Sequence, residues 1–170
     1  ARTRELLNQV NLDLPPETPL ERLSPGERQL VEVAKAIQHD ARIIIFDEPS
    51  TGQDHNTTHI INGLMRRLRE RGTTVVCVSH DMPLLADVVE RVIVMKSTEV
   101  IADASPREVF ADQALMARTN LQAPQVTQIA LQTVVPLGGP VALTPAELAA
   151  DIAQRRGKSA RRGRTSSVAG

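Results

Sequence analysis

The chain has 170 residues, with 20 basic and 20 acidic side chains and a formal net charge of zero, so its charge gives no general attraction to nucleic acid or to anionic membranes. Aromatic residues make up 1% of the chain, which argues against a single-strand nucleic-acid surface, because such surfaces stack bases on aromatic rings. The single cysteine, Cys77, excludes an internal disulfide, and no apolar run approaches the roughly 18 residues of a membrane span. We therefore expect a globular domain that does not bind nucleic acid.

The chain opens with alanine inside a helical pattern (Glu5, Leu6, Leu7 and Val10), and we expect it to be the rear part of a longer polypeptide. The next helix is predicted to begin at Ser24, with Pro25 in its first helical position and Glu27 three residues after the cap. Ser105 and Thr144 begin two further helices with the same pattern. The start at Ser24 also offers free N–H groups, a hydroxyl and Gly26, which together suit an anion, although an ordinary capped helix would read the same way.

Three apolar runs predict strands, at residues 43–46, 74–78 and 92–95. Runs of this length and character suit strands that are buried on both faces, as in parallel sheets. A helical pattern through residues 60–68 lies between the first two runs and is followed by Gly72, a predicted C-terminal cap. The sequence therefore predicts a βαβ unit. Cys77 lies in the middle of the second run and is interpreted as a buried structural thiol.

Two adjacent acids, Asp47 and Glu48, end the first predicted strand. Ligands bind at the carboxyl ends of strands in parallel α/β sheets. Mg²⁺ prefers one or two carboxylates together with substrate phosphates, which suits Asp47, and Glu48 suits a base that polarises an attacking water. Taken alone, the two acids could equally begin a loop.

His80 follows the second predicted strand in the same way. If the two strands are neighbours, His80 and Glu48 open into one crevice, where a histidine can hydrogen-bond a γ-phosphate or the attacking water. A histidine that only caps a strand-to-helix turn is the alternative. Beyond Phe110, short helices are predicted near 112–119, 125–133 and 145–154, and residues 155–170 form a basic tail that we expect to be disordered.

The order and spacing of these segments resemble the ABC ATPase family. Leu23–Glu27 is similar to the family's signature motif, 43–49 to its Walker B motif with the catalytic glutamate, 50–54 to its D-loop and 78–81 to its switch-histidine loop. The resemblance implies an α/β fold with a P-loop NTPase-like parallel sheet flanked by helices, and a small C-terminal helical extension. It divides the chain into a partial ABC ATPase domain at 1–110, the extension at 111–154 and the basic tail at 155–170.

The family resemblance also implies a nucleotide sandwich, in which two ATPase subunits pair head to tail and drive a transmembrane transporter subunit. By matching position, Ser24 and Gly26 would contact the γ-phosphate of ATP bound on the partner subunit, and Asp54 would communicate across the dimer. Asp47 would serve the Mg²⁺ shell, while Glu48 and His80 would be the catalytic groups. The resemblance places such a subunit at the cytoplasmic face of the cell membrane.

Several positions depart from the family pattern. Pro25 replaces the usual first glycine of the signature and Glu27 its glutamine, and we expect Glu27 to fold back onto the cap. Gln53 replaces an apolar D-loop residue, and Ser97-Thr98 forms a predicted hairpin turn without glycine. The largest departure is that no G-x-x-x-x-G-K-[ST] phosphate loop (Walker A) occurs in the 170 residues. We therefore expect the chain alone to bind ATP poorly and to hydrolyse little.

The segments after the histidine indicate the type of transporter. Residues 91–95 and 100–110 are similar to importer ATPases, and 124–128 with 143–148 to the energy-coupling factor group, which serves uptake of vitamins and of cobalt or nickel. The stretch 30–37 fits the carbohydrate-importer ATPases equally well, and that group is the alternative. A non-transport ABC ATPase is a third reading, but the chain has neither a long coiled-coil insertion nor a strongly basic surface.

Overall fold

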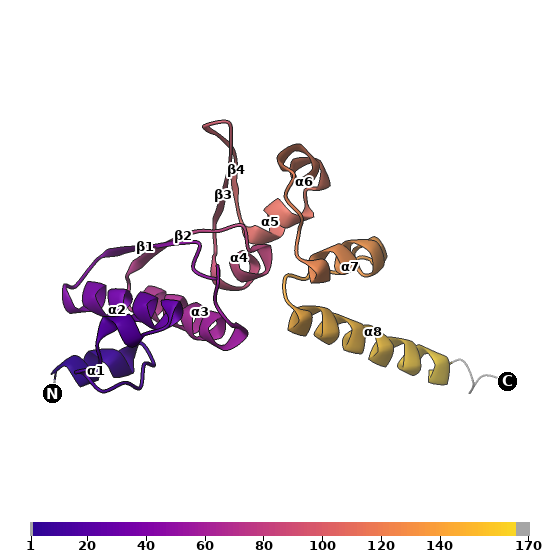
Figure 1. The fold of residues 1–170 in the computed structure, drawn as a ribbon. Helices are drawn as coiled ribbons and strands as arrows, with labels where there is room; N and C mark the ends of the chain where they lie inside the picture. Colours follow the sequence, from indigo (N-terminus) through magenta and orange to yellow (C-terminus); the bar gives the residue numbers. More distant parts are fainter. Residues whose placement is uncertain (1, 166–170) are drawn as a thin grey trace. The chain divides into compact units, whose positions relative to one another are not determined.

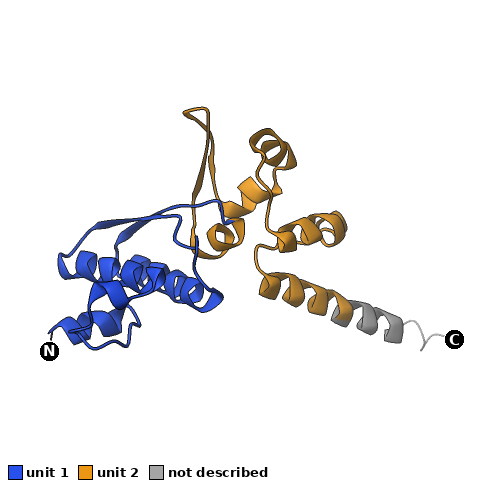
Figure 2. Cartoon of the chain, viewed as in Figure 1, with its two compact units in different colours: residues 1–81 blue, residues 82–170 orange. Residues whose placement is uncertain are grey.

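The computed structural model describes residues 2–165 of the chain, and side chains as far as Arg156. The chain forms two compact units, residues 1–81 and residues 82–170 (Figure 2). We describe each unit by itself. None of the helices in the described part of the chain combines the length and the apolar character needed to cross a membrane.

The first unit contains a βαβ arrangement, as predicted (Figure 1). Strands β1 and β2 pair in parallel, with Ile43 opposite Thr74 and Asp47 opposite Val78. The connection between them is α3, which packs against β2. The elements of this unit, in chain order, are α1 (Arg2–Gln9), the 3-10 helix η1 (Leu20–Arg22), α2 (Pro25–Gln38), β1 (Ile43–Asp47), α3 (His55–Glu70) and β2 (Thr74–Val78).

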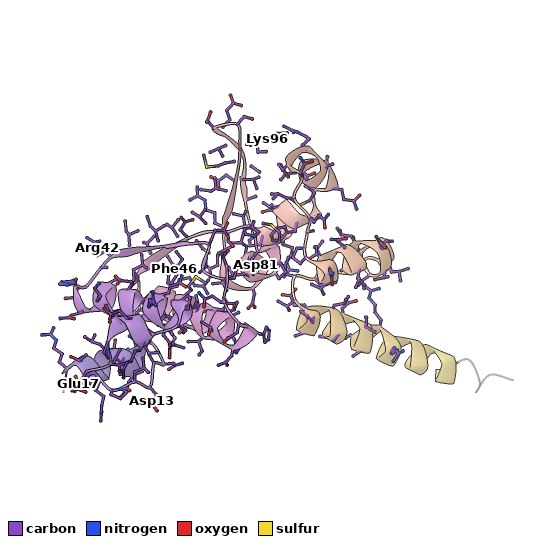
Figure 3. All side chains as sticks on the ribbon, in the orientation of Figure 1. Asp13, Glu17, Arg42, Phe46, Asp81 and Lys96 are labelled. Atoms are coloured by element: carbon purple, nitrogen blue, oxygen red, sulfur yellow. The ribbon has the colours of Figure 1, made fainter. Side chains whose placement is uncertain are left out.

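The core of the first unit lies on one face of the two strands. Ile44 and Phe46 of β1 are buried there, and α2 and α3 run along this side of the strands (Figure 1; Phe46 is labelled in Figure 3). The opposite face carries the alternate residues, of which Ile43 is 62% exposed and Ile45 67% exposed. The prediction that these strands are buried on both faces is therefore wrong for this chain, because the helices of the unit cover one face only.

Helix α3 ends as its sequence predicts. Gly72 follows the last turn with φ of +86°, a conformation that glycine adopts without strain. The N–H of Thr73 donates to the carbonyl of Leu68 at 3.0 Å, and the N–H of Gly72 donates to that of Arg69 at 2.9 Å. These bonds satisfy carbonyls that the end of a helix would otherwise leave unpaired, and they turn the chain directly into β2.

The second unit begins with α4 and a β-hairpin. Strand β3 pairs antiparallel with β4, so the expectation that the run at 92–95 belongs to the parallel sheet is wrong. The reason is local: Ser97 and Thr98 both have positive φ, 50° and 68°, which is the geometry of a two-residue hairpin turn, and the turn forms without glycine. The elements are α4 (Met82–Val88), β3 (Val92–Lys96), β4 (Glu99–Ala104), α5 (Pro106–Ala111), α6 (Gln113–Thr119), α7 (Gln125–Thr133), the 3-10 helix η2 (Val135–Leu137) and α8 (Pro145–Thr165).

The three helices predicted after Phe110 are present, but the last is longer than expected. Helix α8 continues to Thr165, beyond the predicted end at 154, and 166–170 lie outside the described residues. The predicted disorder of the basic tail at 155–170 stays a prediction. The predicted division at 110 stays a prediction.

Candidate active site

The two acids predicted to carry chemistry lie at the carboxyl end of β1. Asp47 is the last residue of the strand and its side chain is exposed. Glu48 follows with φ of +45°, and its N–H donates to the carbonyl of Val78 at 2.8 Å. The backbone of Glu48 thus continues the ladder to the end of β2 while the chain turns away. Both carboxylates therefore stand at the strand ends, where parallel α/β sheets bind ligands.

The structure brings Glu48 and His80 together, as the sequence predicts for neighbouring strands. His80 Nδ1 lies 2.8 Å from Glu48 Oε2, with the His80 side chain 77% exposed and that of Glu48 36% exposed. The hydrogen bond from His80 lowers the pKa of the Glu48 carboxyl. The same bond raises the pKa of His80. At neutral pH Glu48 is therefore a carboxylate that a neighbouring proton donor holds in place.

Ser79 is a third member of this group, and the sequence did not predict a role for it. Its Oγ lies 3.2 Å from Glu48 Oε2 and also accepts the N–H of Asp81 at 3.1 Å. Asp81 is the last residue of the first unit (labelled in Figure 3). The sequence does contain a signal for this role. Ser79 directly precedes His80 at the end of β2, and a hydroxyl at that place can reach the end of the neighbouring strand. We call Glu48, Ser79 and His80 the Glu48 cluster.

The start of α2 forms the capping box that the sequence predicts. Ser24 Oγ accepts the N–H of Glu27 at 3.3 Å, and Glu27 Oε2 accepts the N–H of Ser24 at 2.8 Å. The folding back of Glu27 is thus confirmed, and its carboxylate is engaged by the cap. Arg28 strengthens the same turn, because its Nε donates to the carbonyl of Leu23 at 3.0 Å.

Gly26 lies against the D-loop of its own chain. It is buried, and a Cβ added at this position would overlap Gln53 Oε1 and Thr57 Cγ2. The sequence predicts that Gly26 helps an anion to approach the helix start, whereas the space over its Cα is filled by Gln53 and Thr57 of the same chain. Only glycine fits such a close approach. We call Ser24, Gly26, Gln53, Asp54 and Thr57 the signature group.

Asp54 closes this group as the N-cap of α3. Its Oδ1 accepts the N–H of Thr57 at 2.6 Å, and this bond lowers the pKa of the Asp54 carboxyl. Two turns lead to it from the strand, since Thr51 N–H donates to the Glu48 carbonyl at 3.1 Å and Gln53 N–H to the Ser50 carbonyl at 3.2 Å. The D-loop therefore connects the Glu48 cluster to the signature group through consecutive hydrogen-bonded turns.

Asp47 is the residue predicted to serve Mg²⁺. Among the described residues no three His, Cys, Asp or Glu side chains gather in a way that could hold a metal ion by themselves. Mg²⁺ needs no such cage, because it binds through one or two carboxylates and completes its shell with phosphates and water. The exposed carboxylate of Asp47, beside Glu48 at the end of β1, fits that mode of binding.

Parts of the chain are similar to known proteins. The family model described as ABC transporter matches residues 1–51. An energy-coupling factor transporter ATP-binding protein from Oenococcus oeni is 33% identical over 135 residues, which are 77% of this chain and 46% of that protein. The chain spans 18% to 48% of the length of such curated relatives.

Solved structures of ATP-binding cassettes share the fold. The cbiO1 protein of Clostridium perfringens, part of the ABC transporter complex cbiONQ, matches 75% of this chain and 51% of its own chain, with a TM-score of 0.60 and 26% identity. A dimeric ATP-binding cassette in a post-hydrolysis state, bound to ADP and Pi, matches 62% of this chain and 46% of its own, with a TM-score of 0.55 and 32% identity. Over residues 1–51 the chain therefore matches the ABC transporter family, and its α/β fold is that of part of an ATP-binding cassette.

Proposed function

We propose that the chain is the rear part of an ATP-hydrolysing subunit that powers a membrane importer of the energy-coupling factor type, for a vitamin or a metal ion. The observation that carries the proposal is the pairing of Glu48 and His80, 2.8 Å apart at the ends of two parallel strands. A carboxylate and an imidazole in this arrangement suit the activation of a water. The relatives of the energy-coupling factor type and the likeness to cbiO1 support the importer class.

In the proposed reaction Glu48 accepts a proton from the water that attacks the γ-phosphate of ATP. Its lowered pKa keeps it ionised and ready to accept at neutral pH. His80, 77% exposed, is accessible to a phosphate oxygen or to the same water on the open side of the strand ends. Asp47 would hold Mg²⁺, which when bound neutralises charge on the phosphates.

The signature group would face the ATP of a second subunit in a head-to-tail dimer. The capping box supports this role, because Glu27 is turned back onto the Ser24 N–H and keeps its charge away from a phosphate at the helix start. Asp54 caps α3, and Thr57 in the first turn of that helix lies against Gly26. A movement of the D-loop would therefore shift the signature group as well. The dimeric cassette among the similar structures supports a second ATPase subunit as a partner. The other proposed partner is a transmembrane transporter subunit, which the ATPase would bind at the cytoplasmic face of the membrane.

The test is ATP hydrolysis by the protein expressed from its complete reading frame, with Glu48 changed to Gln. The amide keeps the shape of the side chain and an acceptor for His80 but removes the base, so we expect turnover to fall by about 10²–10⁴-fold. Glu70→Gln, which alters an exposed glutamate at the end of α3, is the matched control and should leave turnover unchanged. Turnover close to wild type in Glu48→Gln would remove Glu48 from the mechanism.

We also propose that residues 1–170 alone hydrolyse ATP poorly, because no phosphate loop occurs in this sequence. Measuring turnover of the 170-residue chain beside the product of the complete reading frame tests this directly. Turnover by the short chain at the level of the longer protein would contradict it. Solute uptake by membrane vesicles containing the reconstituted transporter then decides between a vitamin, a metal ion and the carbohydrate alternative.

A further inference from the structure

We propose that Ser79 is a positioning residue, which together with His80 holds one oxygen of the Glu48 carboxylate so that the other oxygen, Oε1, is left for the attacking water. This inference rests on the proposed function of Glu48 and deepens it. Both contacts go to the same atom: Ser79 Oγ lies 3.2 Å and His80 Nδ1 2.8 Å from Glu48 Oε2. The carboxylate is therefore fixed from two directions through a single oxygen.

The direction of the Ser79 hydrogen bond follows from its second partner. Ser79 Oγ accepts the backbone N–H of Asp81 at 3.1 Å, and a hydroxyl that accepts one bond still has a single proton to donate. A carboxylate has no proton to donate, so Glu48 can only accept a hydrogen bond from this hydroxyl. The hydroxyl proton is thus directed at Oε2, and the Asp81 N–H holds the hydroxyl itself in place.

This arrangement matters because a glutamate side chain has several rotatable bonds. Glu48 is partly exposed, so packing alone does not fix its carboxylate, and a general base must stand within hydrogen-bond reach of the proton that it removes. The side chains of Ser79 and His80 both contact Oε2 of the Glu48 carboxylate, and the backbone N–H of His80 also lies close to this carboxylate. Because both side-chain contacts go to Oε2, we assign Oε1 as the acceptor of the proton.

If Ser79 only stabilised the turn after β2, its bond from the Asp81 N–H would be sufficient. Such a structural role predicts a different effect of mutation on activity. If Ser79 acts through Glu48, then removing its hydroxyl costs activity only while Glu48 is present. Ser79→Ala removes the hydroxyl, whereas Ser79→Thr keeps it, and both can be combined with Glu48→Gln. Effects of groups that act as one unit are not additive, so this double-mutant cycle separates the two roles.

In the product of the complete reading frame, we expect Ser79→Ala to lower kcat roughly tenfold to a hundredfold, the scale for misplaced catalytic groups, with KM for ATP nearly unchanged. Ser79→Thr should restore kcat, and Ser79→Ala should have no further effect in the Glu48→Gln background. Wild-type kcat in Ser79→Ala, or an equal loss in both backgrounds, would overturn the proposal.

A second measurement needs no hydrolysis and uses the 170-residue chain. The nitrogen NMR signal of His80 Nδ1, recorded at one fixed pH, reports its bond to Glu48. We expect Ser79→Ala to move this signal toward its position in Glu48→Gln, and Ser79→Thr to leave it in place. An unmoved signal in Ser79→Ala would refute the positioning role. If Glu48→Gln hydrolyses ATP normally while the signal moves as expected, the proposed function fails and the contact stands.

Discussion

Replacing Gly26 with alanine tests the packing of the signature helix against the D-loop. The added Cβ would overlap Thr57 Cγ2 and Gln53 Oε1. The Gln53 oxygen is the end of a flexible side chain and can move aside, but Thr57 is β-branched and held in the first turn of α3, so it cannot rotate freely. A substitution at Gly26 made to obstruct a bound phosphate would therefore report this internal overlap first.

The size of the effect follows from two opposing terms. Forcing a methyl group into a filled position costs about 1–3 kcal/mol, while alanine in place of glycine in a helix returns up to about 1 kcal/mol. We expect a net loss of about 1–2 kcal/mol in the free energy of unfolding. The first unit has 81 residues, and for a domain of this size the loss lowers the melting midpoint by roughly 4–16 °C.

The assay is urea unfolding and thermal melting followed by circular dichroism, with Gly63→Ala as the matched control. A Cβ at Gly63 would meet only Arg67 Nη1 at 3.4 Å, an ordinary contact, and Gly63 lies inside α3. The same chemical change should there stabilise the protein by about 0.5–1 kcal/mol. Thr57→Ser removes the obstructing methyl group and should restore most of the stability lost in Gly26→Ala.

Two outcomes would refute this reasoning. The first is a Gly26→Ala variant as stable as the wild type, which would mean that the D-loop moves aside at no cost. The second is an equal loss with and without Thr57→Ser, which would place the obstacle elsewhere. Activity need not be measured for either result.

Two further predictions concern ionisable groups. Cys77 is half-buried, not fully buried as predicted, because the helices of the first unit cover only one face of the strands. Partial burial raises the pKa of its thiol to about 11, so alkylation by iodoacetamide at neutral pH, followed by mass spectrometry, should be much slower in the folded chain than in urea; equal rates would contradict this partial burial. The bond from Thr57 lowers the pKa of Asp54 below its ordinary value of 3.8, so the stability contributed by this cap is present above that pH and is lost as the pH falls through the lowered pKa. Asp54→Asn still caps the helix but cannot titrate, and its melting point should fall less between pH 6 and pH 3 than that of the wild type.

Local chemistry explains which parts of the fold could be predicted from the sequence. The capping boxes at Ser24 and Ser105 and the helix end at Gly72 depend on residues a few positions apart, and all three are present. Thr144 was predicted in the same way but forms only half of the motif. Its Oγ1 accepts the Glu147 N–H at 3.3 Å, while the Glu147 carboxylate accepts the N–H of Leu143 at 2.8 Å and lies 3.1 Å from Arg107. Arg107, which is distant in sequence, thus contacts the carboxylate that the local pattern assigned to the capping box.

The features that could not be predicted depend on long-range packing. An apolar run reads the same in a strand covered on both faces and in one covered on a single face, so the exposure of Ile43 and Ile45 was not visible in the sequence. The close approach of Gly26 to Thr57 likewise joins segments that are far apart in the chain. The pairing of Glu48 with His80 could be predicted, because strand order alone brings the two strand ends together. The roles of the site residues remain predictions.

The backbone at Glu48 gives the last test. Its φ of +45° lies in the left-handed region, which costs a residue with a Cβ more than it costs glycine. A charged residue in this conformation, at the end of a strand, suggests that the side chain is kept for a function rather than for stability. Two variants without the carboxylate separate these contributions: Glu48→Gly removes the side chain and the backbone strain, whereas Glu48→Ala removes the side chain only.

We therefore expect Glu48→Gly to melt at a higher temperature than Glu48→Ala, although glycine also gains freedom in the unfolded chain. Both variants should hydrolyse ATP equally poorly, because neither has a base. A more stable alanine variant would show that the strain is small compared with the entropy of glycine, and the conformation of Glu48 would then carry no argument about function. A more stable glycine variant without activity would show that this position favours the reaction at the expense of the fold, as strained residues at active sites do.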